Sequence, residues 1–200
     1  MSNTPTLPGQ AAKLNLTIEQ GATFDRLLTY RSSPTVKRAI SAMTKANPGK
    51  VTAAAHGFVT GDKLFLSKLK GMAQADNRAY TITVLDADNF TLGVDTTTYD
   101  AYVSGGTADN GKPVDLTGYT ARMQVRAKVT DTATVLDLTT ANGGIVLGGT
   151  AGTIRILATA AQTAALTIAS GFYDLELIDG TSAVRRLMEG AVTLSKEITR

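Results

Sequence analysis

Cysteine and tryptophan are absent from the 200 residues of this chain, and histidine occurs once. Without cysteine, disulfides, thiolate metal ligands and a cysteine nucleophile are excluded. No run approaches the roughly 20 apolar residues of a membrane-spanning helix, and residues 1–10 lack the apolar centre of a secretory signal. We expect a protein that is made in a cytoplasm, does not enter a membrane, and stays soluble or joins an assembly there.

Clustered charge is also missing. The 20 lysines and arginines exceed the 17 acidic residues by three, and they are scattered along the chain. Nucleic-acid-binding domains gather their basic residues in a patch, and those that bind single strands add aromatic side chains for stacking. Neither feature is present, so no nucleic-acid partner is expected.

What the sequence does contain is alternation. From Tyr119 to Arg126, apolar and polar residues alternate at every position. A period of two is the signature of a strand with one buried face and one wet face. Residues 13–19 and 172–178 repeat the pattern, threonine and glycine are abundant, and leucine-rich helical runs are few. The sequence therefore predicts an all-β protein.

Turn-forming residues at 32–34 and 110–111 divide the chain into an outer part and an insertion. Between them, short strands recur at intervals of about 8–12 residues, which is typical of a small barrel or sandwich. We predict a small β-barrel-like domain at 36–108, inserted in a hairpin of an outer domain formed by residues 13–35 and 109–200. Residues 1–12 show no periodicity and are predicted to be an N-terminal arm.

Helix signals are confined to one place. Thr159 and Gln162 have the spacing of a capping box, in which each side chain bonds the backbone N–H of the other residue. This pattern predicts one short helix near 159–166, because Gly171 follows closely. Asp179-Gly180 then predicts a hairpin between strands 172–178 and 184–194.

Four charged residues are predicted to face one another across neighbouring strands: Arg122, Arg126, Asp174 and Glu176. Opposite charges across a strand pair contribute about 0.2–1 kcal/mol each, so these residues are expected to fix register more than stability. Asp174 and Glu176 also have a spacing, about 6.5–7 Å along one strand face, that a hydrolase carboxylate pair can use. Nothing else marks a cleft, and a solvated strand face is the preferred interpretation.

The single histidine, His56, lies in a tight connection with Gly57, Gly61 and Asp62. Zinc binding or general-base catalysis needs partner residues at suitable spacing, and none accompanies this histidine. His56, Gly57, Gly61 and Asp62 are therefore predicted to be structural turn residues, with His56 bonded to the backbone near Gly57.

No catalytic, metal or cofactor site emerges from the remaining motifs. Asp86 and Asp88 flank a turn, where aspartate normally bonds its own backbone, and they supply too few carboxylates for calcium. The glycine pairs at 143–144 and 148–149 lack the lysine and hydroxyl residue of a phosphate-binding loop. We predict that the chain is not an enzyme and that it needs no cofactor.

The outer part resembles a known family. Segments 21–30, 113–126, 172–177, 186–190 and 193–200 are similar to the N-terminal, virion-attaching domain of tailed-phage upper baseplate proteins. This resemblance implies an immunoglobulin-like β-sandwich that docks on a tail or baseplate. Members of that family often have a longer C-terminal part with fibres or receptor-binding modules, to which no segment of this sequence corresponds.

The insertion resembles a second module that phages carry. Segments 47–62, 80–84, 89–92 and 102–107 are similar to a module usually named after the first catalytic-cysteine half-domain of ubiquitin-activating enzymes. The resemblance implies a β-barrel-like fold. Because this chain has no cysteine, thioester chemistry is not implied.

Together the two resemblances imply a structural component of a tailed-bacteriophage particle, at the tail, baseplate or fibre-attachment region. The expected location is the virion, after synthesis in the host bacterial cytoplasm. The expected partners are other virion proteins and copies of itself around a symmetric tail. The alternative is a carbohydrate or host-surface binding module carried on the virion, with Tyr80, Tyr99 and Tyr102 offering faces for a glycan.

Overall fold

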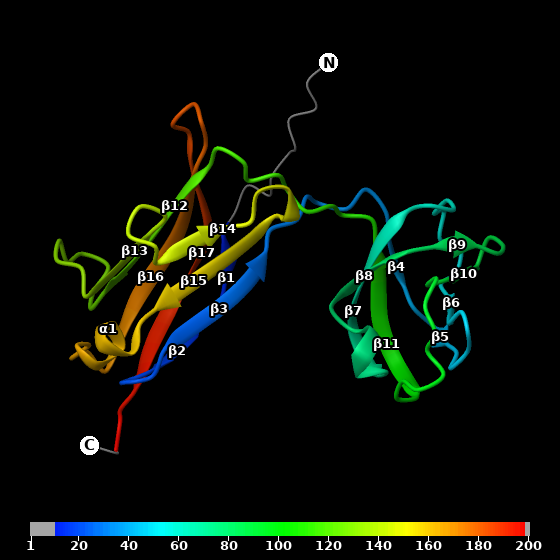
Figure 1. Cartoon of the computed structure of the whole chain (residues 1–200), viewed down its shortest axis with the longest axis horizontal. Coiled ribbons are helices and arrows are strands. Elements are labelled where there is room, and N and C mark those ends of the chain that lie inside the picture. Colours follow the sequence, from blue (N-terminus) through cyan, green and yellow to red (C-terminus); the bar gives the residue numbers. More distant parts are fainter. Residues whose placement is uncertain (1–10, 199–200) are drawn as a thin grey trace. The chain divides into compact units, whose positions relative to one another are not determined.

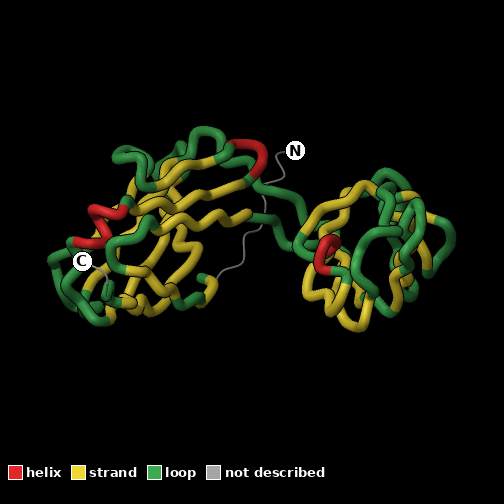
Figure 2. Tube along the Cα trace, turned by 60° about the horizontal axis from the view of Figure 1, so that its bottom comes forward, coloured by secondary structure: helices red, strands yellow, loops and turns green. Residues whose placement is uncertain are grey.

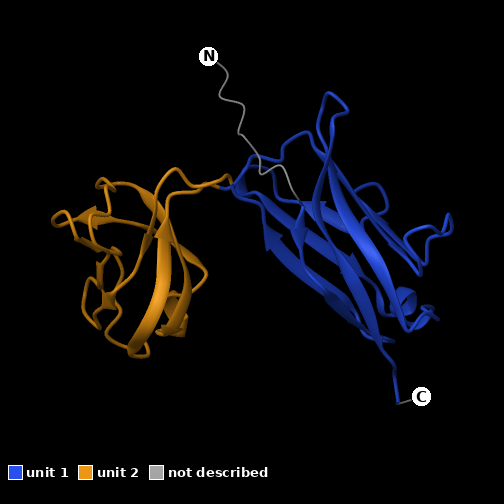
Figure 3. Ribbon diagram, turned by 180° about the vertical axis from the view of Figure 1, so that it is seen from behind, with its two compact units in different colours: residues 1–31, 113–200 blue, residues 32–112 orange. Residues whose placement is uncertain are grey.

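The computed structural model describes residues 11–198, and the chain divides into two compact units, coloured separately in Figure 3. Unit 1 is formed by residues 1–31 and 113–200, and unit 2 by residues 32–112. The division falls after residues 31 and 112, against the predicted 35 and 108. The predicted arm lies outside the described residues up to position 10, and Ala12 already begins a strand.

Unit 1 contains a six-stranded sheet built around one long strand, β17, near the C-terminus (Figure 1). β17 pairs antiparallel with β16 on one side and in parallel with both β1 and β2 on the other. β16 then pairs with β12 and β12 with β13, all antiparallel. The strands are β1 (Ala12–Lys13), β2 (Leu16–Glu19), β17 (Val184–Ser195), β16 (Ser170–Ile178), β12 (Thr120–Arg126) and β13 (Leu136–Thr139).

The second sheet of unit 1 has three antiparallel strands in the order β14-β15-β3. These strands are β14 (Ile145–Leu147), β15 (Thr153–Ala158) and β3 (Phe24–Thr29). Buried side chains of both sheets form one core, including Leu16, Ile18, Met123 and Leu175 from the first and Ile145, Ile154 and Ile156 from the second. Unit 1 is therefore a β-sandwich, and the all-β prediction is confirmed.

The alternation that predicted a strand at 119–126 matches the burial of β12. Ala121, Met123 and Val125 are almost fully buried, while Thr120 and Arg122 are exposed. Burying the apolar face of this central strand removes it from water, at roughly 25 cal/mol for each Å² of apolar surface. A shift of one residue would turn these side chains to solvent, so the pattern also fixes the register.

Leu14 departs from the predicted pattern. The alternation of residues 13–19 places Leu14 inward with Leu16 and Ile18, but its side chain is 39% exposed. The cause is the break between β1 and β2, where Leu14 N–H donates to Glu189 O at 3.0 Å and Asn15 Oδ1 accepts from Ala191 N–H at 3.1 Å.

Within residues 11–198, helical structure is limited to three short segments, shown in red in Figure 2. The predicted helix is α1 (Ala160–Ala164), and the other two are the 3₁₀ turns Ala73–Ala75 and Gly149–Ala151. Thr159 N–H donates to Gln162 Oε1 at 2.8 Å, and Gln162 N–H donates to Thr159 Oγ1 at 3.3 Å. The predicted capping box is thus confirmed.

Unit 2 has two four-stranded antiparallel sheets, in the orders β5-β6-β10-β9 and β4-β11-β7-β8. The first contains β5 (Ala42–Met43), β6 (Lys50–Thr52), β10 (Asn89–Thr91) and β9 (Thr83–Val84). The second contains β4 (Lys37–Ala39), β11 (Tyr102–Asp109), β7 (Lys63–Gly71) and β8 (Arg78–Thr81). Both contribute to a core that includes Val51, Leu64, Leu66, Phe90 and Leu92.

The sheets of unit 2 are open, and among the described residues no strand pairing closes them into a barrel. The barrel-like prediction therefore holds only at the level of a small all-β unit. The alternation did not predict the eight-residue strand β11, which contains the glycine pair Gly105 and Gly106. Both have positive φ, 71° and 91°, and the register of β11 against β7 shifts between Tyr102 and Ser104, so the strand continues through an irregular stretch.

The insertion point also differs from the prediction. Unit 2 leaves the chain after β3 and returns before β12, and these strands belong to different sheets, so it is not inserted in a hairpin. Arg31 and Pro113 form an isolated antiparallel bridge at this point. Within unit 2, Ser32 N–H donates to Lys112 O at 2.8 Å, and Lys112 N–H donates to Ser32 Oγ at 3.0 Å.

Residues 32–112 are expected to fold when produced alone. Their core is internal to the unit, and their two ends are already held together by hydrogen bonds. The measurement is thermal unfolding by circular dichroism together with the dispersion of amide signals in NMR. A fragment without a cooperative transition would show that unit 2 depends on residues outside 32–112.

Candidate functional site

The outer face of the six-stranded sheet of unit 1 carries most of the charged residues that the sequence singled out. Arg122 lies directly opposite Glu176 in the β12–β16 pairing, and its Nη2 is 2.7 Å from Glu176 Oε2. A second bond, from Arg122 Nε to the same oxygen, measures 2.8 Å. Of the four residues expected to face one another, Arg122 and Glu176 do so, and their ion pair ties β12 to β16 on the solvent side.

Asp174 and Arg126 do not pair with each other. Asp174 lies opposite Gln124 on β12 and binds Arg186 of β17, with 3.1 Å between Arg186 Nη2 and Asp174 Oδ2. Arg186 also contacts Glu189 at 3.2 Å. Arg186 thus joins two carboxylates on neighbouring strands.

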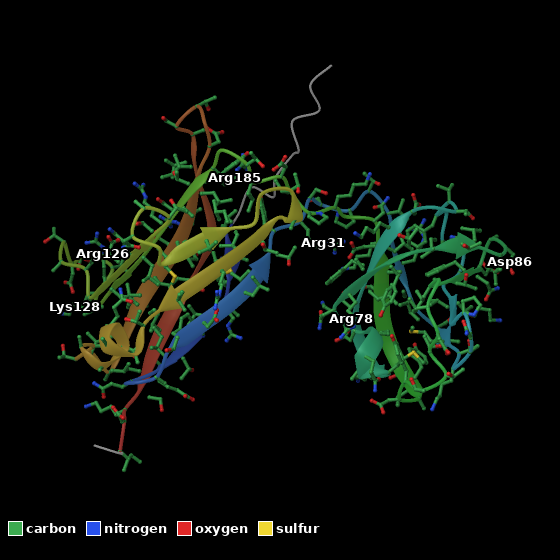
Figure 4. The ribbon with its side chains drawn as sticks, viewed as in Figure 1. Arg31, Arg78, Asp86, Arg126, Lys128 and Arg185 are labelled. Atoms are coloured by element: carbon green, nitrogen blue, oxygen red, sulfur yellow. The ribbon has the colours of Figure 1, made fainter. Side chains whose placement is uncertain are left out.

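The prediction that Arg126 faces an acid of β16 is wrong, since Arg126 lies opposite Phe172. Its guanidinium donates instead to the backbone O of Asp131 at 2.5 Å and to Gln124 Oε1 at 2.8 Å. Gln124 in turn donates to Asp137 Oδ1 of β13 at 3.1 Å. Arg126 and Lys128 lie at the end of β12, where the chain enters the loop to β13 (Figure 4).

A depression of about 600 Å³ lies on this face, over β1, β12, β16 and β17. Phe172, one of its two aromatic residues, is 48% exposed, whereas Tyr173 is buried, and Val129 from the loop after β12 is 74% exposed. Charged residues of both signs surround them, namely Lys13, Arg126, Asp174, Arg186 and Glu189. Aromatic side chains and arginine are enriched at protein interfaces, whereas lysine and carboxylates are depleted there.

Sequence reasoning missed the central role of Phe172 in this depression. The alternation of residues 172–178 places Phe172 on the outward face, opposite in phase to the buried Tyr173, so its exposure was readable. Val129, Lys13 and Glu189 carried no such signal, because the strand order that brings them together joins residues far apart in the sequence.

His56 is enclosed in unit 2 and is 1% exposed. Phe58 N–H donates to its Nδ1 at 3.0 Å, and its Nε2 lies 3.0 Å from Asp86 O. Because Nδ1 accepts a bond, the proton lies on Nε2, which donates to Asp86 O. The ring stacks on Phe58 at 5.3 Å and makes a T-shaped contact with Phe90 at 5.4 Å, so both nitrogens are hydrogen-bonded within the fold and the ring contacts two phenylalanines.

The neighbouring turn residues also serve the backbone. Gly57 and Gly61 have φ of 65° and 95°, values that favour glycine. Asp62 Oδ2 accepts from Val59 N–H at 3.0 Å, which closes the turn before β7. His56 and Asp62 thus have backbone partners, and Gly57 and Gly61 supply positive φ in the connection between β6 and β7.

Asp86 fixes the turn that follows β9. Its Oδ1 accepts from Asp88 N–H at 2.8 Å, and Asn89 Nδ2 donates to both carboxylate oxygens at 2.9 and 3.0 Å. These hydrogen bonds, that of Asp88 first, lower the pKa of Asp86 below its usual range. The contribution of Asp86 to stability is therefore present above the unfolded pKa of about 3.9 and is lost as pH falls through the lower, folded value.

We expect Asn89→Ala to raise the pKa of Asp86 part of the way toward its ordinary value, since the Asp88 N–H bond remains. An NMR titration of the Asp86 carboxyl in both proteins measures the change. Asp76→Asn, at another surface aspartate of unit 2, serves as the control and should leave the Asp86 titration unchanged. Identical Asp86 curves in the parent protein and Asn89→Ala would contradict the assignment.

The three tyrosines considered as glycan-stacking residues pack against the core of unit 2. Tyr80 is 7% exposed, and Tyr99 and Tyr102 are partly buried. The hydroxyl of Tyr102 donates to Ile40 O at 3.0 Å and to Gly105 O at 2.9 Å. The three rings therefore pack within unit 2 and do not form an open aromatic platform for a glycan.

Within residues 11–198, no group of three or more histidine, aspartate or glutamate side chains is placed to hold a metal ion. No described helix is long and apolar enough to cross a membrane. Three carboxylates of the outer face, those of Glu176, Asp174 and Glu189, are engaged with arginines.

Comparison with protein families finds a match for one part of the chain. Residues 46–112 match the family model described as the Ubiquitin-activating enzyme E1 FCCH domain. The match lies within unit 2 and begins near β6, so it leaves unit 1 unassigned. A search of curated proteins finds no match to the chain.

Proposed function

We propose that this chain is a non-enzymatic structural component of a tailed-bacteriophage particle. Its place would be the tail, the baseplate or the fibre-attachment region, and it would act through protein–protein contacts. The proposal draws on the resemblance of the outer segments to virion-attaching domains. The match of residues 46–112 accords with the second resemblance, to a module that phages carry.

One observation supports the contact role above the others, namely the depression on the outer face of unit 1. Phe172 supplies an exposed ring, an ion pair with Asp174 holds Arg186, and hydrogen bonds to Asp131 O and Gln124 hold Arg126, all before any partner binds. Aromatic and arginine side chains dominate the energetics of protein interfaces. Repetition of such a surface around a symmetric tail multiplies weak contacts, because each further contact is made within one assembly.

The first test is mass spectrometry of purified particles from the phage or prophage that encodes the chain. Peptides from both units are expected in stoichiometric amounts relative to tail proteins. Their absence from intact particles would remove the proposal.

The surface itself is tested by Phe172→Glu, which places a carboxylate in the depression. We expect incorporation into particles to fall by about tenfold or more, since truncating an interface anchor costs at least about 1–2 kcal/mol. Val184→Glu is the matched control, because Val184 is 52% exposed but does not line the depression. Equal incorporation of the two variants would show that the depression is not the contact surface.

A further inference from the structure

β3 is an edge strand of unit 1 with one row of unpaired backbone groups. Leu157 N–H donates to Gly144 O, on the side of β14, whereas Gly152 O accepts from Tyr30 N–H, on the side of β3. The backbone groups of successive residues along β15 therefore point alternately toward β14 and toward β3. With a period of two, the backbone groups of Asp25, Leu27 and Thr29 point away from β15. Within residues 11–198, no hydrogen bond to these groups on the free side is present.

This edge is the longest among the described strands. β3 has six residues, whereas the other edge strands have two to four, namely β1, β2, β13, β14, β4, β5, β8 and β9. Natural sheets protect their edges by short strands, proline, bulges or charge. Of these protections β3 has only charge, at Asp25 and Arg26; it contains neither proline nor glycine, its pairing with β15 is regular, and Leu27 is 64% exposed.

An apolar groove of about 250 Å³ adjoins the same strand. It lies between the inward side of β3 and the β17 region and is lined by Leu28, Tyr30, Leu175, Leu187 and Met188, among others. The hydroxyl of Tyr30 is buried and has no hydrogen-bond partner in the described part of the chain. A buried hydroxyl without a partner costs free energy, and an incoming polar group can remove that cost.

Two arginines lie on the inward side of this edge. Arg26 shares the inward side of β3 with Leu28, and Arg185 lines the groove and is labelled in Figure 4. No carboxylate of residues 11–198 forms a salt bridge with either arginine, in contrast to Arg155, which binds Asp25 on the outward side. An inward-facing arginine on an edge strand opposes pairing with strands that bring no opposite charge.

We propose that the free edge of β3 receives an extended strand from a partner polypeptide. The partner segment has about six residues, matching β3, with apolar side chains at alternate positions over the groove and a carboxylate facing Arg26. Main-chain hydrogen bonds supply the attraction, and the alternate side chains supply selectivity. This inference deepens the proposed contact function and rests on it to the extent that a partner polypeptide must exist.

A second copy of β3 fits this edge less well. In a symmetric pairing centred on Leu27, Phe24 comes opposite Tyr30 of the other copy, but Phe24 is 9% exposed and already belongs to its own core. In the symmetric pairing centred on Arg26, the two Arg26 side chains oppose each other. Neither register fills the groove with an apolar side chain, so the partner is a different segment.

The test uses the full chain and a displayed library of random eight-residue peptides. Peptides that bind are expected to alternate, with apolar residues on one side and a glutamate or aspartate among them. Affinities of the selected peptides are then measured by fluorescence anisotropy, for the parent protein and for three variants.

Leu27→Pro removes the central free-edge donor without touching the β15 ladder, and edge strands accept proline at such positions. It is expected to weaken peptide binding by about tenfold or more. Leu27→Thr keeps the N–H and is the matched control, with binding close to that of the parent. Arg26→Glu should reverse the preference, favouring peptides in which lysine replaces the acidic residue.

Three outcomes would overturn the inference. The first is that no peptide is enriched, and the second is that Leu27→Pro and Leu27→Thr bind the peptides equally while circular dichroism shows both to be folded. The third is that the chain associates with itself and that Leu27→Pro abolishes this association. The last result would assign the edge to a second copy. Presence of the chain in particles together with a failed peptide test would remove this inference alone. Peptide binding by a chain that is absent from particles would remove the proposed virion role.

Discussion

Gly190→Ala is expected to destabilise unit 1 by about 2–4 kcal/mol. A Cβ at position 190 would lie 2.1 Å from Leu14 O, a backbone atom that side-chain rotation cannot move. The same oxygen accepts a hydrogen bond from Tyr173 Oη at 2.7 Å. Displacing Leu14 therefore breaks the bond to a buried hydroxyl and loosens β1 from β17, where Leu14 N–H donates to Glu189 O.

Chemical denaturation of the full chain measures this loss, with hydrogen exchange assigning the transition to unit 1. Gly180→Ala is the matched control, since a Cβ at Gly180 meets no atom within 4 Å. Its effect should stay within about 0.5 kcal/mol. If the two alanine variants unfold alike, the close approach of Leu14 to β17 is not as described.

His56→Ala is expected to destabilise unit 2 by about 3–5 kcal/mol. The substitution leaves Phe58 N–H and Asp86 O without their partner in a buried place and removes a ring that contacts Phe58 and Phe90. Loss of volume and loss of hydrogen bonds both contribute. Denaturation of the full chain, followed by the amide signals of unit 2, gives the magnitude.

His56→Phe separates the two contributions. It keeps an aromatic ring between Phe58 and Phe90 but removes both hydrogen bonds, so a loss of about 1–3 kcal/mol is expected. An effect below that of His56→Ala would assign the difference to packing. A stable His56→Ala protein would mean that the histidine is retained for a reason other than the fold.

Local patterns predicted the elements of this fold better than their assembly. The alternation in β12 and the capping box at Thr159 and Gln162 each depend on neighbouring residues, and both are present in the structure. β11 was missed because Gly105 and Gly106 have the composition of a turn but lie within a strand that β7 supports. A single sequence contains no local signal for that support, which comes from a strand far away in the chain.

The candidate surface could likewise be predicted only in part, because it too depends on contacts between distant segments. The pairing of Arg122 with Glu176 followed from two strands whose phases were readable, but Arg126 was assigned to an acid and lies opposite Phe172. The loop after β12 determines this outcome, because Asp131 O captures the guanidinium. The edge of β3 was also beyond sequence reasoning, since an edge is defined by which strand is missing on one side.

The bridge between Arg31 and Pro113 has a consequence for how such proteins diversify. Two chain segments that already lie one strand spacing apart, about 5 Å, can be joined by a tight loop or by any module whose ends match that separation. Replacing residues 32–112 by a tight turn, or by another module whose ends lie equally close together, is therefore compatible with the geometry of the unit 1 sandwich.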